Sequence, residues 1–211
     1  RDMNFYDVVH EHLEYYSLKS INYLMEKNGL TVIDASTNFV NGGSLRVLVT
    51  HIESNKTKSK RYKEILDEEG KWSLENTNTY IQYENKIQDI IKKTKNFILN
   101  EINSGGLVIG LGASTKGNVL LQICGITKQL LPYISDRNKE KVGLRTLGTD
   151  IEIISEEKAH ELNPSSMLVI PWNFKEEILK REKYYIENGG KLLFLMPYPN
   201  YITSNGETKL E

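Results

Sequence analysis

Residues 110–118 combine the side chains and the backbone freedom that an anion-binding turn requires. Glycines stand at Gly110, Gly112 and Gly117, with Ser114 and Lys116 between them. Glycine lets the backbone approach an anion closely, the N-terminus of a following helix presents unpaired N–H groups, and lysine adds a positive charge. The spacing matches neither the dinucleotide-binding fingerprint nor the P-loop. The segment predicts a strand, turn and helix for an anionic ligand; the alternative is a packed turn with a solvated lysine.

A second cluster, His10-Glu11-His12, places imidazole and carboxylate groups side by side. Metal-binding helices carry their two histidines one turn apart, whereas alternate residues share a face only in a strand, with Glu11 on the other side. We therefore expect no metal site here. A histidine beside a carboxylate also suits general-base catalysis, because imidazole titrates near neutral pH. Surface or structural histidines are the alternative.

Other polar residues follow predicted strands or occupy loops. Asp136 suits either the hydroxyl groups of a ligand or a turn or helix cap. Arg145 suits a phosphate or a surface carboxylate. Trp172 and Asn173 could form a flat ligand-binding surface with a hydrogen-bonding amide; alternatively, Trp172 only packs at the edge of the core.

The elements that must position these residues can be read from the hydrophobic pattern. Residues 17–27 predict an amphipathic helix, and β-branched runs at 30–35 and 45–50 predict an antiparallel pair around Asn41-Gly42-Gly43. Residues 57–103 are rich in charge with apolar residues at helical spacing, which indicates one or two linking helices.

The remainder predicts alternating strands and helices, which is typical of a parallel sheet that binds ligands at the carboxyl ends of its strands. The strands are expected at 107–112, 132–135, 166–170 and 191–196, and the helices at 115–124, 155–162 and 174–188.

Composition limits the function classes. The chain has 211 residues and a formal net charge of -1, which gives no general attraction to nucleic acid or anionic membranes. No apolar run approaches the ~20 residues of a membrane span. Cys124 is the only cysteine, which excludes an internal disulfide and a cysteine zinc site and favours a cytoplasmic location.

Four motifs occur in an order that is specific in combination: His10 to Ser17, Gly42 to Arg46, Gly112 to Asn118, and Pro171-Trp172-Asn173. Together they resemble the sugar C-methyltransferase family, whose members use S-adenosylmethionine to methylate carbon 3 of nucleotide-linked 4-keto-deoxysugars. The resemblance extends over about residues 5–202.

The resemblance implies a zinc-binding domain, a class I methyltransferase domain and a Rossmann-like C-terminal domain. Residues 1–53 would be the terminal helix and β-hairpin of the methyltransferase domain, 54–104 a helical linker, 105–202 the Rossmann-like α/β domain, and 203–211 a flexible tail. Zinc and most of the S-adenosylmethionine site would belong to a missing N-terminal part that precedes Arg1. We therefore expect this chain alone to be inactive.

The resemblance also implies residue roles, with a nucleotide sugar and the missing methyltransferase domain as partners. His12 matches the base that removes the proton from carbon 3, and Glu11 is its neighbour. Ser114, Lys116, Asn118 and Asp136 would line the nucleotide-sugar side, and we add Gly112, Gly117, Arg145, Trp172 and Asn173 to the predicted binding site.

Three positions depart from the family pattern. Val9 stands where some relatives have a tyrosine, Asn41 where His-Gly-Gly is common, and Leu147 where Pro-Gly-Thr is common. The alternative function is a non-catalytic Rossmann-like domain that binds a nucleotide sugar or is purely architectural.

Overall fold

The computed structural model describes residues 3–38, 40 and 43–211, which form two compact units. The larger unit contains Lys86–Glu211 together with the N-terminal residues up to His10, and the smaller unit contains Glu11–Asn85. The boundary falls inside the long helix α3 (Thr77–Asn103). The expected division after residues 53 and 104 follows family domains and stays a prediction.

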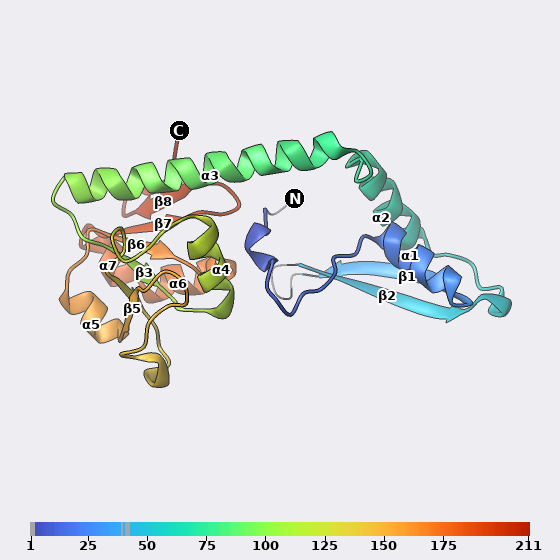
Figure 1. Ribbon diagram of the computed structural model, residues 1–211, viewed down its shortest axis with the longest axis horizontal. Helices are drawn as coiled ribbons and strands as arrows, with labels where there is room; N and C mark the ends of the chain where they lie inside the picture. Colours follow the sequence, from blue (N-terminus) through green and yellow to red (C-terminus); the bar gives the residue numbers. More distant parts are fainter. Residues whose placement is uncertain (1–2, 39, 41–42) are drawn as a thin grey trace. The chain divides into compact units, whose positions relative to one another are not determined.

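The smaller unit is a β-hairpin covered by helices (Figure 1). The hairpin strands β1 and β2 are antiparallel, which confirms the predicted pair, although Asn41 and Gly42 of the expected turn lie outside the described residues. Ser17 caps the first helix, since its Oγ accepts from the Ser20 N–H at 3.1 Å. The elements are α1 (Leu18–Lys27), β1 (Leu30–Asn38), β2 (Ser44–His51), η3 (Ile52–Ser54) and α2 (Lys60–Lys71).

The larger unit contains a seven-stranded sheet with the order β5-β4-β3-β6-β7-β8-β9. The first five strands in this order are parallel, and β8 and β9 add an antiparallel hairpin. The predicted Rossmann-like α/β fold is thus confirmed. The strands are β3 (Val108–Leu111), β4 (Tyr133–Ser135), β5 (Glu152–Ile154), β6 (Ser166–Val169), β7 (Lys191–Phe194), β8 (Asn200–Thr203) and β9 (Gly206–Lys209).

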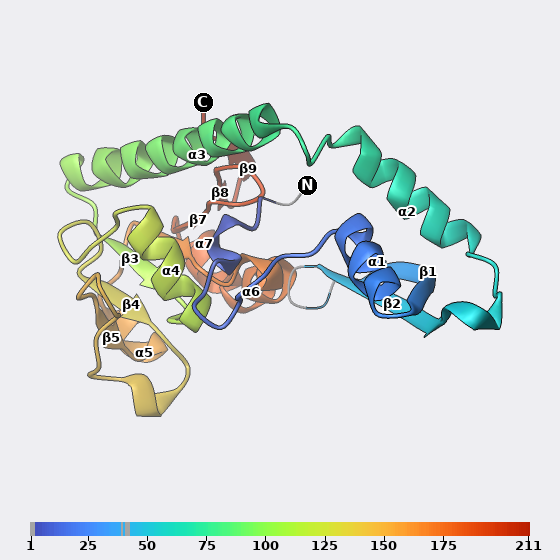
Figure 2. The ribbon, with the colours of Figure 1, turned by 45° about the vertical axis from the view of Figure 1, so that its right-hand side comes forward.

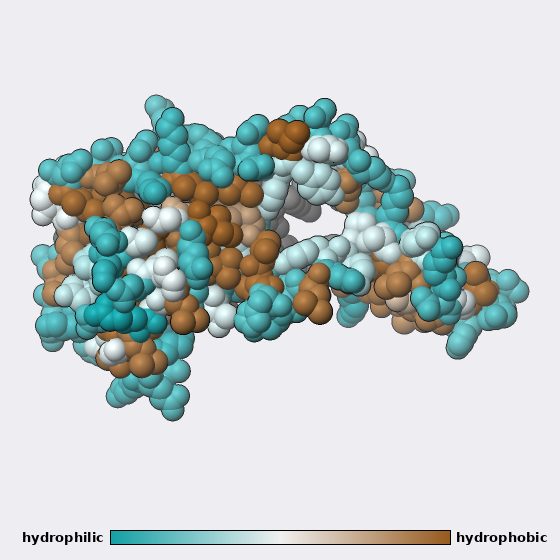
Figure 3. Space-filling view, in the orientation of Figure 1, coloured by the Kyte–Doolittle hydropathy of each residue, from teal (hydrophilic) through white to brown (hydrophobic). Residues whose placement is uncertain are grey.

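Helices pack on this sheet, and α3 lies along it in both views (Figures 1 and 2). Exposed Lys92, Asn96 and Asn100 belong to the outer side of α3, which is hydrophilic in Figure 3. The other elements of this unit are η1 (Phe5–Asp7), α4 (Thr115–Ile123), η4 (Lys139–Lys141), α5 (Glu156–Glu161), η5 (Trp172–Phe174), α6 (Lys175–Arg181) and α7 (Lys183–Glu187).

The core lies on both faces of the parallel strands. Met167 and Leu192 on one face and Leu168 and Leu193 on the other are completely buried, as expected for strands that helices cover on either side. The strand order reverses at β3: the chain moves from β3 to β4 and β5, then crosses back to β6 on the other side. The carboxyl ends of β3 and β6 therefore form a topological switch point, where open α/β sheets bind ligands.

Four details differ from the predicted elements. Neither β5 nor β8 was predicted, because the two isoleucines of β5 directly precede the expected helix at 155–162 and β8 follows Pro197 and Pro199 without a readable alternation. The helix expected at 174–188 is interrupted at Glu182, whose buried side chain accepts a hydrogen bond from Arg181 and lies 3.2 Å from His160. The tail expected to be flexible instead forms β9, whose backbone pairs with β8.

An ion pair joins α3 to the sheet and makes the stability of this unit dependent on pH. Lys191 Nζ lies 2.6 Å from Glu101 Oε1, and Ser166 Oγ donates to Oε2 at 2.8 Å. Burial opposes ionisation of Glu101, but these hydrogen bonds and the charge of Lys191 outweigh it and lower the pKa of the carboxyl.

Because the folded pKa of Glu101 is depressed, its contribution to stability is complete above the unfolded value of about 4.5 and is lost as the pH falls through the folded value. We expect the free energy of unfolding to decrease below that pH in urea titrations. Glu101→Gln should make this decrease shallower. An equally steep decrease in the variant would contradict the assignment.

Candidate functional site

The predicted turn begins where β3 ends. Gly112 has φ +90°, and a Cβ there would lie 2.7 Å from Pro171 Cδ, so glycine permits both the backbone conformation and the close approach of the loop after β6. Ser114 is the N-cap of α4 and accepts from the Gly117 N–H at 3.0 Å. Gly117 in turn packs against Ile170. The turn therefore brings the start of α4 close to the β6 loop at the switch point.

Lys116 is paired within the protein. Its Nζ lies 2.5 Å from Asp7 Oδ1 and 5.9 Å from the centre of the Tyr6 ring. Asp7 and Tyr6 belong to η1, which packs on α4. The positive charge expected for an anionic ligand is therefore neutralised by a carboxylate of the same unit.

Tyr6 connects the turn to the β6 loop. The ring is 5% exposed, and its hydroxyl faces the side chains of Trp172 and Asn173. Burial and, next, the charge of Asp7 raise the pKa of Tyr6 to about 12, against the opposing effect of Trp172 and Asn173. Trp172 itself is partly buried against the main core cluster. Tyr6 thus contacts Lys116, Trp172 and Asn173, all three of which belong to the predicted binding site.

Asp136 lies beyond the end of β4 and is tied to the glycine turn through Lys141. Lys141 Nζ is 3.1 Å from Asp136 Oδ2 and donates to the Ala113 carbonyl at 2.7 Å. The Asn138 N–H donates to Asp136 Oδ1 at 2.8 Å. A carboxylate accepts about four hydrogen bonds. Asp136 therefore serves as the turn aspartate considered above and retains capacity for ligand hydroxyl groups.

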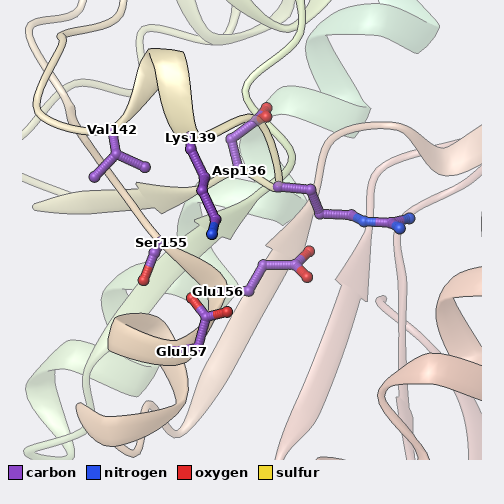
Figure 4. A pocket seen from close by; sticks show the side chains of 7 residues that line it. Asp136, Lys139, Val142, Ser155, Glu156 and Glu157 are labelled. Atoms are coloured by element: carbon purple, nitrogen blue, oxygen red, sulfur yellow. The ribbon is translucent and has the colours of Figure 1, made fainter.

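An open pocket of about 530 Å³ lies next to Asp136 (Figure 4). Lys139 points from η4 toward Ser155 and Glu156 at the start of α5 (Figure 4). The carboxylates can accept hydrogen bonds from the hydroxyl groups of a polyol, the Ser155 hydroxyl can accept or donate, and the cations can contact an anion. The lining consists of Asp136, Arg137, Lys139, Val142, Ser155, Glu156 and Glu157.

The loop from Gly143 to Asp150 is held by several contacts of its own. Arg145 Nη1 donates to the Asp150 carbonyl at 3.1 Å and lies 3.2 Å from Asp150 Oδ1, and Arg145 forms a backbone bridge with Glu152. Asn118 Oδ1 accepts from the Leu147 N–H at 3.1 Å, which docks this loop on α4. Arg145 thus contacts a surface carboxylate, one of its two predicted partners.

His12 and Glu11 belong to the smaller unit, whereas the other predicted residues belong to the larger unit. Both side chains are exposed, and the His12 ring meets the Tyr15 ring edge to face, with centroids 6.2 Å apart. The segment between η1 and α1 has no regular secondary structure. His12 is thus accessible to a substrate, as a base requires, and its role stays a prediction.

The larger unit brings together most of the predicted binding residues and adds three that sequence reasoning missed. Tyr6 and Asp7 were missed because they contact α4 across a long sequence separation, and Lys141 because it lies in a charged loop. The signal available in the sequence was the pair Tyr6-Asp7, an aromatic residue followed by a carboxylate shortly before His10. Within the described ranges, no cluster of three His, Cys, Asp or Glu side chains forms a metal site, and none of the helices is long and apolar enough to cross a membrane.

Comparison with known proteins places this architecture in a family. A model of the C-methyltransferase C-terminal domain matches residues 39–197. The chain is also 31% identical over 204 residues to the C-methyltransferase NovU of Streptomyces niveus. This alignment covers 97% of this chain and 49% of that protein. The chain therefore spans about half the length of this curated relative. Because the family model matches more than half of the chain, the chain belongs to the family of C-methyltransferase C-terminal domains.

Proposed function

We propose that the chain is the C-terminal part of an S-adenosylmethionine-dependent enzyme that methylates carbon 3 of a nucleotide-linked 4-keto-deoxysugar. The larger unit would hold the nucleotide sugar and the segment around His12 would supply the base. The observation that carries the proposal is the gathering of Lys116, Asp136, Trp172 and Asn173 at the carboxyl ends of β3, β4 and β6. Membership of a C-methyltransferase family supports the reaction class. The single cysteine is consistent with a cytoplasmic location.

The proposed chemistry starts with removal of a proton from carbon 3, which the neighbouring ketone acidifies. His12 would accept this proton, and Glu11 would orient the imidazole. The resulting enolate makes carbon 3 nucleophilic. Contacts of the nucleotide with the larger unit would fix the sugar against the base, because correct alignment contributes as much to such a reaction as the base does.

S-adenosylmethionine would supply the methyl group, and the switch-point residues do not fit it. Its sulfonium is positively charged, whereas the turn after β3 carries Lys116, whose charge Asp7 only balances, so the turn offers the sulfonium no net electrostatic attraction. We therefore assign the larger unit to the sugar nucleotide and derive no step that passes through the methyl donor.

A second candidate is an architectural domain without a ligand. It is favoured by one observation: Lys116, Asn118, Asp136 and Arg145 all contact other groups of the larger unit. In that case these side chains stabilise loops, and their removal should change stability but not affinity for any nucleotide.

Titration of thymidine diphosphate into the 211-residue chain separates the two candidates. We expect binding by calorimetry, and ligand at 100 times its dissociation constant should stabilise the fold by about 2.7 kcal/mol. Lys116→Ala should weaken binding at least ~10-fold, because it removes a charge-assisted contact.

The matched control is Lys93→Ala, which removes a lysine that pairs with Asp89 on α3 in the same unit. It should leave the affinity unchanged. Equal affinity in wild type and Lys116→Ala would exclude the turn as the phosphate site, and the absence of binding in all three proteins would favour the architectural candidate.

A further inference from the structure

The ion pair between Asp7 and Lys116 occupies the place where the turn would hold a ligand anion. The side chains are 24% and 32% exposed, so both remain in contact with water. Lys116 belongs to the first turn of α4, where unpaired N–H groups and the helix dipole favour negative charge. A carboxylate at this position satisfies the same electrostatic demand as a phosphate oxygen.

The element that carries Asp7 is short and covers the switch point. η1 is a single 3-10 turn, and it packs on α4. Tyr6 adds a contact to Trp172 and Asn173 from the loop after β6. The N-terminal segment thus touches both loops between which open α/β sheets bind ligands.

We propose that Asp7 is an internal competitor for the anion site, and that binding of the nucleotide sugar exchanges the Asp7 carboxylate for a phosphate at Lys116. The inference rests on the proposed function and adds a regulatory contact to it. A diphosphate carries more negative charge than a carboxylate and so displaces it from a cation near a helix N-terminus.

The exchange links ligand binding to the proposed base. Asp7 is followed directly in the chain by the segment that leads to His10 and His12, which has no regular secondary structure. While Asp7 is paired with Lys116, the start of this segment is held on α4. When a phosphate takes Lys116, this restraint on the start of the segment is removed, so Asp7 acts as a positioning residue for the base.

The test uses inorganic pyrophosphate as the probe and the whole 211-residue chain. If Asp7 is paired with Lys116 in most protein molecules, only the remaining fraction can bind the anion, and the apparent affinity is lowered in proportion to that fraction. Asp7→Asn keeps the shape but removes the charge, so pyrophosphate should bind about tenfold more tightly than to wild type. Asp89→Asn removes the exposed carboxylate of the pair with Lys93 in the same unit and should leave the affinity unchanged.

A second measurement does not depend on an Asp7 variant. In a Trp72→Phe background, Trp172 is the remaining tryptophan, and it lies against Tyr6. Saturating pyrophosphate should shift its emission as η1 moves. An unchanged emission spectrum at demonstrated saturation would overturn the exchange.

The outcomes separate the two proposals. If wild type and Asp7→Asn bind pyrophosphate equally while Lys116→Ala does not, the anion site stands and the competition is overturned. If none of the variants binds pyrophosphate, the anion site at Lys116 fails, and the exchange fails with it. Tighter binding by Asp7→Asn together with a Trp172 shift supports both.

Discussion

Replacement of His12 by alanine in the full-length enzyme is expected to lower kcat by about 10²–10⁴-fold, the usual contribution of a positioned general base. The side chain is exposed and lies in a segment without regular structure, so its removal should leave the fold intact. Binding of the nucleotide sugar should persist, because its proposed contacts lie in the larger unit. Single-turnover methyl transfer and calorimetry measure the two effects separately.

His10→Ala is the matched control, since His10 is also exposed and stands on the other side of Glu11. It should retain most of the activity. Addition of imidazole should restore part of the rate to His12→Ala, because a free base can enter the space left by the side chain. Equal losses in the two variants, without rescue, would argue against a specific base at His12.

The second large effect concerns the turn itself. Gly112→Ala should destabilise the larger unit by about 3 kcal/mol, because alanine at positive φ is strained and its methyl group would overpack the interior. The added Cβ would lie 2.7 Å from Pro171 Cδ, and proline cannot rotate away. Urea unfolding of the Trp72→Phe protein, followed through Trp172, reports on this unit alone because Trp72 belongs to the other unit.

Gly105→Ala provides the comparison. Gly105 has φ +82° with no atom within 4 Å of an added Cβ, so only backbone strain remains and the loss should be about 1 kcal/mol. A similar loss at both positions would mean that the loops after β3 and β6 separate easily. Such mobility would weaken the case for a preformed site at the switch point.

The sequence predicted those elements in which apolar residues recur at the spacing of a helix or a strand. Alternating and helical patterns located α1, the β1–β2 hairpin and the parallel strands around β3. The same reasoning failed for β5, which directly precedes an expected helix, and for β8 and β9, which carry no readable alternation of apolar and polar residues. All four residues of β9 are exposed and none is a large apolar residue, so its backbone pairing with β8 defines it as a strand.

The candidate site was predictable as a set of residues but not as a set of contacts. The glycine spacing and the strand ends pointed to Gly112, Lys116, Asp136 and Trp172, because topology brings strand ends together. The partner of Lys116 could not be predicted, since Asp7 meets it only through tertiary packing. Charge pairs between distant segments leave no mark in local spacing.

The two edge strands of the seven-stranded sheet determine whether the sheet can pair with strands of other chains. An unpaired strand edge is a template for another chain, and charged residues or a covering loop prevent such pairing. At one edge β9 presents Glu207 and Lys209, and at the other the loop around Arg145 bonds to β5. Among the described strands, the apolar ones at the centre are therefore shielded from intermolecular pairing. Removal of the last residues would expose β8 and favour aggregation, although the segment looks dispensable in the sequence.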